Sequence, residues 1–127
     1  MNKTIFETKK APAPVGPYSQ AVGINGFVFC SGQIALDAES GEVFTGEIKE
    51  QTKRCMDNAK EVLLEAGLSF DNVIKTTIFL TDMDDFAQVN EVYATYFQED
   101  PPARSCVAVS QLPKGVNVEV EILAFKG

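Results

Sequence analysis

The chain has 127 residues, of which 45% are apolar and 23% charged, so we expect one globular domain spanning residues 1–127. Eleven Lys and Arg against eighteen Asp and Glu give a net charge of −7, and no dense basic run interrupts this balance. Proteins that bind nucleic acid through its phosphates carry a basic stripe, so neither nucleic acid nor an anionic membrane is an expected partner.

The absence of histidine restricts the chemistry most strongly. It excludes Ser-His-Asp and Cys-His catalysis and a histidine-ligated metal. Cys30, Cys55 and Cys106 form no CxxC pair, which argues against a disulfide framework or a cysteine-built metal site. Residues 1–10 lack the apolar core of a signal peptide, and no apolar run approaches the roughly 18 residues of a membrane span. We therefore expect a soluble, cytoplasmic protein.

The first predicted element is a β-hairpin. Residues 11–17 contain three prolines and are not expected to form regular structure. Residues 20–24 and 27–31 are short apolar runs joined by Asn25-Gly26. An Asn-Gly pair tolerates positive φ at both positions, so it is the strongest local signal for a hairpin turn.

A long amphipathic helix is predicted over residues 47–66. Its apolar positions recur every three or four residues, polar residues fill the other face, and Gly67 follows as a C-terminal cap. The positions of this stripe are Ile48, Thr52, Cys55, Ala59, Val62, Leu63 and Ala66.

The rest of the chain predicts three strands and one helix. Residues 73–80 are rich in β-branched residues and form a strand. A second helix begins after a cap at residues 82–85, with Phe86, Val89, Tyr93 and Phe97 on its apolar side, and ends at Pro101-Pro102. The last two strands cover residues 104–109 and 116–125, around a turn at 113–115. This order, β-hairpin-α-β-α-β-β, predicts an α/β (α+β) domain.

The predicted strands are apolar on both faces. In the hairpin, Phe27 and Phe29 alternate with Val28 and Cys30. In the strand at residues 73–80, one face is assigned the apolar residues Ile74, Ile78 and Leu80, and the other Val73 and Phe79. In the last strand, Val118, Val120 and Ile122 alternate with a face that includes Leu123 and Phe125. Two helices can cover only one face of such a sheet, and a large uncovered apolar face usually marks an interface. We therefore expect a homo-oligomer packed sheet against sheet.

Two kinds of charged residue stand in the predicted strands. Arg104 shares a strand face with Cys106 and is either a sheet-edge charge paired with a glutamate or a rigid fork for a carboxylate. Glu119, flanked by valines, is either a solvated edge carboxylate or a partly desolvated acid that moves a proton near neutral pH. Glu121 has the same strand parity and is the alternative functional carboxylate.

Several uncharged residues are also candidates for a site. Asn90 lies on the apolar stripe of the second helix, where an unpartnered amide would cost about 1–3 kcal/mol, so it bonds either a neighbouring loop or a ligand. Ser31-Gly32 follows a strand and is either a tight turn or a point of close ligand approach. Tyr18 is either a pocket lid or a core residue, and Cys106, with no histidine to activate it, is a small filler rather than a nucleophile.

Four segments together resemble the Rid (YjgF) family over almost the whole chain. They read APAPVGPYSQAV, CSGQIALDAESGEV, VIKTTIFLTDMDDFAQVNEVYATYF and PPARSCVAVSQLPKGVNVEVEILAF. The resemblance implies a chorismate-mutase-like subunit with a mixed sheet covered on one face by two helices. It also implies a homotrimer whose sheets form a central barrel, with active sites in the clefts between subunits.

The same resemblance implies hydrolysis of enamine and imine acids, such as 2-aminoacrylate and 2-aminocrotonate, to 2-keto acids and ammonia, with neither metal nor cofactor. By the resemblance, Arg104 and the Cys106 backbone hold the substrate, Glu119 positions the attacking water, and Tyr18, Ser31, Gly32 and Asn90 line the pocket. The rival interpretations are an endoribonuclease or translation inhibitor, and a noncatalytic metabolite-binding or holdase protein.

Overall fold

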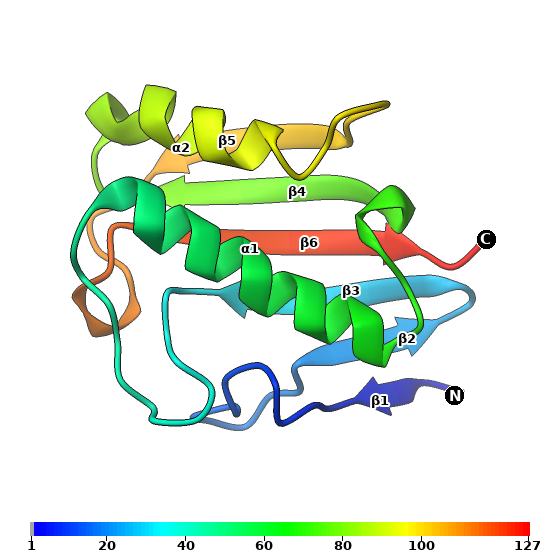
Figure 1. Cartoon of the computed structure of the whole chain (residues 1–127). Helices are drawn as coiled ribbons and strands as arrows, with labels where there is room; N and C mark the ends of the chain where they lie inside the picture. Colours follow the sequence, from blue (N-terminus) through cyan, green and yellow to red (C-terminus); the bar gives the residue numbers. More distant parts are fainter. Residues whose placement is uncertain (1) are drawn as a thin grey trace.

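The computed structural model, which describes residues 2–127, has two layers (Figure 1). Two α-helices, α1 (Ile48–Glu65) and α2 (Phe86–Ala94), lie on one face of a six-stranded sheet. The strands are β1 (Thr4–Phe6), β2 (Ala21–Ile24), β3 (Phe27–Gln33), β4 (Val73–Leu80), β5 (Ala103–Ala108) and β6 (Val118–Phe125). Short 3₁₀ turns lie at Phe70–Asn72, Met83–Asp85 and Pro113–Gly115.

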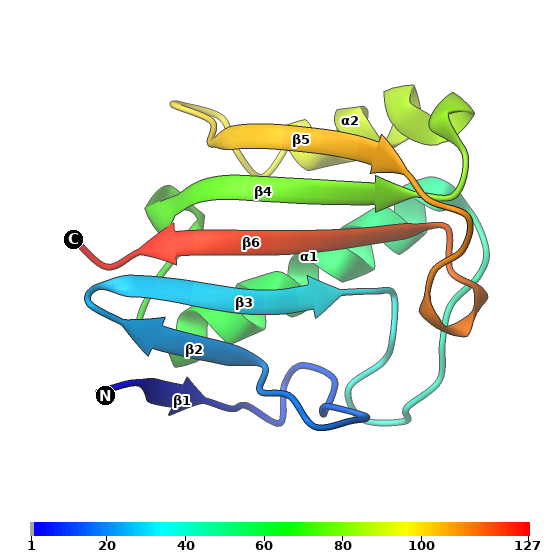
Figure 2. The same cartoon turned by 180° about the vertical axis from the view of Figure 1, so that it is seen from behind.

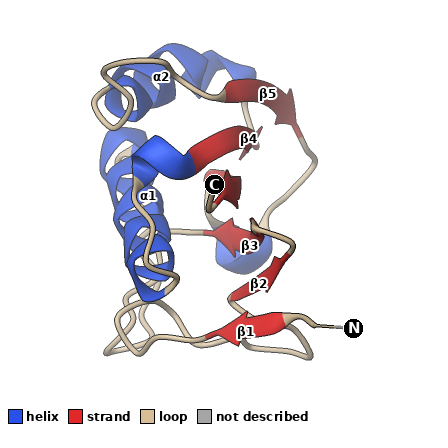
Figure 3. Cartoon of the chain, turned by 90° about the vertical axis from the view of Figure 1, so that its right-hand side faces the viewer, coloured by secondary structure: helices blue, strands red, loops and turns tan. Residues whose placement is uncertain are grey.

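The strand order is β1-β2-β3-β6-β4-β5. Neighbouring strands are antiparallel except for β4 and β5, so the sheet is mixed. Because β6 is inserted between β3 and β4, the last strand of the chain lies near the middle of the sheet. Viewed along the sheet, both helices lie on the same side (Figure 3). The predicted α+β class, with a mixed sheet covered on one face, is confirmed.

The N-terminal hairpin forms as predicted. β2 and β3 are antiparallel, and the turn residues Asn25 and Gly26 have φ values of 51° and 86°. The edge strand β1 was not predicted from the sequence. It has three residues, two of them exposed, and is too short for an alternating pattern to show.

The first helix also agrees with its predicted stripe, because every residue named there is buried. Gly67 follows the helix with φ 77°, the left-handed conformation of a C-terminal cap. The second helix ends at Ala94, earlier than the predicted stop at Pro101. The amides of Tyr96 and Phe97 bond carbonyls three residues back, and both rings pack against Phe70 at 5.3 Å between centroids. After Ala94 the backbone therefore forms tighter turns that are accompanied by this aromatic packing, and the α-helix ends before Pro101.

No helix formed by residues 2–127 lies over the opposite face of the sheet (Figure 2). Phe29 is 50% exposed there, and Phe27, Val107 and Phe125 are also exposed. One sequence assignment was wrong: a register shift between Val73 and Lys75 places Val73 in the core and leaves Ile74 43% exposed. No helix within residues 2–127 has the length and apolarity needed to span a bilayer.

Candidate active site

Arg104 is held at the edge of the sheet by the second helix. It lies in β5, and its Nη1 donates a hydrogen bond to Oδ1 of Asn90 in α2 at 2.7 Å. The guanidinium carbon also lies 5.0 Å from the centre of the Tyr93 ring and 5.4 Å from that of Phe86. The amide oxygen of Asn90 therefore accepts from the arginine rather than from a neighbouring loop.

The remaining donors of this guanidinium are free for another group. Within residues 2–127 Arg104 forms no ion pair, so no glutamate of the same chain is its partner. Apart from the bond to Asn90, no hydrogen bond of this side chain is found in that range. A planar fork oriented by one amide and two aromatic faces is suited to bidentate contact with a carboxylate.

Sequence reasoning did not assign the two aromatic residues a role beyond the core. Phe86 and Tyr93 were placed on the apolar stripe of their helix, on which Asn90 also lies. Tyr93 is fixed in turn, because its hydroxyl lies 2.7 Å from the hydroxyl of the buried Thr76. The sequence signal for this contact was the spacing of the three residues. Phe86 lies four positions before Asn90 and Tyr93 three positions after it, which places all three side chains on one helix face.

A second group of predicted residues lines a cavity of about 410 Å³ at one end of the sheet. Tyr18, Ser31, Gly32 and Glu119 all border it, together with Glu121. The walls come from the loop before β2, the end of β3 with the chain after it, and the start of β6 with the turn before it, which gather at the same end of the sheet in Figure 2.

A β-bulge explains why Ser31 and Gly32 stand where they do. Between Cys30 and Gln33 the β3 strand has one residue more than β6, so its register shifts. The hydroxyl of Ser31 donates to the carbonyl of Ser19 at 2.6 Å, which ties the bulge to the loop before β2. Gly32 lies directly against Glu119, because a Cβ added there would be 2.8 Å from the carboxyl carbon of that glutamate. The glycine is therefore needed for close approach, and the carboxylate occupies the space of its missing side chain.

Glu119 has the properties of the desolvated acid that the sequence left as one alternative. Its burial, and to a lesser extent the charge of Glu121, raise the pKa of this carboxyl group above its ordinary value. Glu121 borders the same cavity but is exposed. Of the two candidates, Glu119 is therefore the better placed to exchange a proton with a bound substrate.

Cys106 lies in β5 on the same face as Arg104, partly buried against the core. Burial raises the pKa of its thiol, and the nearby Arg104 opposes this only in part. Cys30 and Cys55 are buried, and burial raises the pKa of the Cys30 thiol to about 12. A thiol with a raised pKa is a poor nucleophile, in agreement with the sequence interpretation of these residues.

The two groups lie on opposite faces of the sheet. Arg104 is paired in register with Thr76, whose side chain is buried on the helix side. Glu119 alternates with the buried Val118 and Val120, so its side chain points to the uncovered side. A single chain therefore does not bring the arginine and the glutamate together.

Comparison with known proteins identifies the family. The family model described as endoribonuclease L-PSP matches residues 8–126. A RutC family protein of Pyrococcus abyssi is 52% identical over 126 residues, covering 99% of both chains. The 2-iminobutanoate/2-iminopropanoate deaminase of Mus musculus is 46% identical over 125 residues, covering 98% of this chain and 93% of the mouse protein.

Solved structures agree with this result. A protein of the conserved Rid family from Yersinia pestis is 46% identical, with a TM-score of 0.95 over 98% of this chain and 99% of that one. E. coli TdcF, solved with bound serine, is 42% identical, with a TM-score of 0.93 over 98% and 99% of the two chains. The chain belongs to the Rid family, also described as the endoribonuclease L-PSP family.

Proposed function

We propose that this protein is an imine deaminase that hydrolyses short 2-imino acids and their enamine tautomers, such as 2-aminoacrylate and 2-aminocrotonate, to 2-keto acids and ammonia. The observation that carries the proposal is the Arg104 guanidinium, held by Asn90 and two aromatic rings with its remaining donors free. The name of the mouse relative and the serine bound to TdcF support it, because both concern small molecules with an α-carboxylate.

In the proposed reaction Arg104 binds the substrate carboxylate through two parallel hydrogen bonds, with the backbone of Cys106 beside it. The imine carbon is already electrophilic, so catalysis needs orientation, a water molecule and a route for protons. Glu119 accepts a proton from the water as the water oxygen bonds to that carbon, and it passes this proton to the imine nitrogen, which gives a carbinolamine. Glu119 then accepts the hydroxyl proton and delivers it to the nitrogen as the C–N bond breaks, so that ammonia and the keto acid are released.

Both halves of this site are needed, and they lie on opposite faces of one sheet. We therefore propose that a second copy supplies the missing half, so that Arg104 and Asn90 of one subunit face Tyr18, Ser31 and Glu119 of the next. The exposed apolar residues of the uncovered face, such as Phe29 and Phe125, support association through that face. A homotrimer is the assembly that the family resemblance implies.

A coupled trapping assay tests the activity. A threonine or serine dehydratase releases the imino acid in the presence of semicarbazide, which traps it before spontaneous hydrolysis. We expect added protein to lower the yield of trapped imine in proportion to its concentration and to release the keto acid. Unchanged trapping, with keto-acid binding in a titration, would instead indicate a noncatalytic metabolite-binding protein.

Endoribonuclease activity is the alternative named in the family description. The net charge of −7 and the two carboxylates that border the cavity disfavour binding of an RNA phosphate there. RNA cleavage that persists through extensive purification and is abolished by Arg104→Ala would favour it over the deaminase.

Replacing Gly32 with alanine is expected to lower kcat for the imino acid about 100-fold, because a Cβ at this position displaces the Glu119 carboxylate and a shift of about 1 Å has effects of this size. Gly32 does not have a positive φ, so alanine fits the backbone and we expect the thermal unfolding midpoint to change little. Trapping kinetics and thermal unfolding measure the two effects. An unchanged kcat would show that the position of this carboxylate does not matter for turnover.

A further inference from the structure

Asn117, the residue directly before β6, bonds two other segments through both its side chain and its backbone. Its amide donates to Oε1 of Gln51 at 2.9 Å, and its Oδ1 accepts from Nε2 of the same glutamine at 3.0 Å. Its Nδ2 donates to the hydroxyl of Thr81, directly after β4, at 3.0 Å, and its carbonyl accepts from the amide of Thr81 at 3.2 Å. Gln51 lies in α1, is 0% exposed, and also donates to the carbonyl of Gly46 at 2.9 Å. These bonds join the beginning of α1, the end of β4 and the beginning of β6, which lie at the same end of the sheet (Figure 2).

Glu119 follows two residues later, where the sheet holds β6 on one side only. The pairing of β3 with β6 ends at Gln33 and Val120, before Glu119 is reached. On the other side, the pairing of β4 with β6 ends at Leu80 and Val118, one residue beyond Glu119. The backbone of Glu119 therefore has a strand partner in β4 alone, close to the point where the ladder ends and the bonds of Asn117 begin.

The carboxylate of Glu119 takes its position from this backbone. Within residues 2–127 no hydrogen bond to the carboxylate is found, and burial and a neighbouring charge account for its raised pKa. It packs against Gly32, where a Cβ would lie 2.8 Å from its carboxyl carbon. A group that transfers protons must be held to within about 0.5 Å by the residues that support it. For Glu119 that support has to come through the strand on which it stands.

We infer that Asn117 is a positioning residue: through its bonds to Gln51 and Thr81 it fixes the beginning of β6 and so holds the Glu119 carboxylate beside Gly32. The inference rests on the proposed function and adds a residue to its machinery. Asn117, Gln51 and Thr81 lie outside the lining of the cavity that residues 2–127 form, so they act through Glu119 rather than on the substrate.

The test is Asn117→Leu, which keeps the size and branching of the side chain but removes its two hydrogen bonds. A misplacement of about 1 Å costs about 100-fold in rate, so we expect a smaller shift of Glu119 to lower kcat about tenfold. Because Arg104 binds the carboxylate of the substrate, KM and the affinity for pyruvate should change less than about twofold. Trapping kinetics with the threonine-derived imine and a pyruvate titration measure the two quantities.

Asn72→Leu is the matched control, because it makes the same change at the other end of β6. The Nδ2 of Asn72 donates to the carbonyl of Phe125 at 3.2 Å, and its Oδ1 accepts from the amide of Ser69 at 3.0 Å. We expect both variants to lower the thermal unfolding midpoint and only Asn117→Leu to lower kcat. Equal losses of kcat in the two variants would indicate a purely structural role and overturn the inference. An unchanged kcat in Asn117→Leu would overturn it as well.

If Asn117→Leu does not fold, two substitutions of Thr81 decide. Thr81→Val keeps the shape but removes the hydroxyl that accepts from Asn117, whereas Thr81→Ser keeps the hydroxyl. The valine variant should lose kcat and the serine variant should retain it; equal activity of the two would overturn the inference.

Failure of the proposed function is recognised separately, as a wild-type protein that does not hydrolyse the imine. Crystal structures of the wild type and of the variant that folds, Asn117→Leu or Thr81→Val, then decide. We expect the distance between the carboxyl carbon of Glu119 and the Cα of Gly32 to increase by about 0.5 Å or more in the variant. An unchanged distance would overturn the inference, whatever reaction the protein catalyses.

Discussion

Replacing Arg104 with lysine is expected to lower kcat/KM for the imino acid about 100-fold. Lysine keeps the charge but loses the planar fork and the geometry of the bond to Asn90. A hydrogen bond to a charged group contributes about 1.5–3 kcal/mol, and each 1.36 kcal/mol corresponds to about tenfold in rate. Trapping kinetics measure the loss, and titration with pyruvate should show a matching loss of keto-acid affinity.

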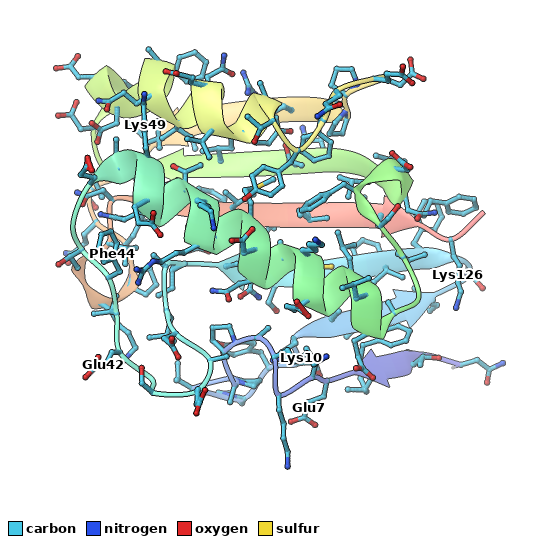
Figure 4. All side chains as sticks on the ribbon, in the orientation of Figure 1. Glu7, Lys10, Glu42, Phe44, Lys49 and Lys126 are labelled. Carbon is cyan, nitrogen blue, oxygen red and sulfur yellow. The ribbon has the colours of Figure 1, made fainter. Side chains whose placement is uncertain are left out.

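Arg54→Lys is the matched control for this substitution. Arg54 is also an arginine with one polar partner and an aromatic face: its Nε lies 2.9 Å from Glu50, and its guanidinium lies 4.1 Å from the centre of the Phe44 ring. Phe44, labelled in Figure 4, belongs to the loop that leads into α1 and does not line the cavity beside Glu119. We expect the control to retain wild-type activity. Wild-type activity in Arg104→Lys would remove the arginine from the mechanism.

Replacing Glu119 with glutamine is expected to lower kcat by a factor of about 10²–10⁴, the usual contribution of a general acid–base. Glutamine has nearly the same shape and can occupy the space above Gly32, but it cannot take up a proton. KM and the affinity for pyruvate should therefore change little. A large rise in KM with kcat unchanged would show that this residue binds substrate rather than transferring a proton.

The pH dependence separates Glu119 from Glu121. Burial, and then the charge of Glu121, raise the pKa of Glu119, so its carboxylate form is lost at a higher pH than for an ordinary glutamate, whose pKa is about 4.3. As the pH falls, wild-type kcat/KM should decline through this raised pKa. Glu121→Gln removes a neighbouring negative charge, so it should shift the decline to lower pH and keep most of the activity. If Glu121→Gln abolishes turnover and Glu119→Gln does not, the functional carboxylate is Glu121.

The Arg104→Lys and Glu119→Gln variants, expressed together, show whether the site is shared between two copies of the chain. When chains carrying Arg104→Lys and chains carrying Glu119→Gln are expressed together, some mixed interfaces contain the native arginine from one copy and the native glutamate from another. Recovery of activity in the mixture, absent from either variant alone, is therefore expected. No recovery would mean that Arg104 and Glu119 do not act together in a site shared between copies.

The sequence by itself determined the local structure. The Asn25-Gly26 turn and the stripe of α1 are periodic or turn signals carried by neighbouring residues, so they could be recognised without knowing the fold. The candidate residues Arg104, Asn90 and Glu119 were found in the same way, each as a polar residue in an otherwise apolar pattern. The errors came where packing outweighed the local pattern: the early end of α2 at Ala94, and the exposed Ile74 at a register shift.

Only the tertiary structure decided what these residues do for one another. The contact between Asn90 and Arg104 depends on where α2 crosses β5, and the position of Glu119 over Gly32 depends on the insertion of β6 beside a bulge in β3. The placement of Arg104 and Glu119 on opposite faces likewise follows from strand order and register. These features join segments far apart in the chain, and no local period encodes which strand lies beside which; that choice is made when the apolar faces pack into a single core.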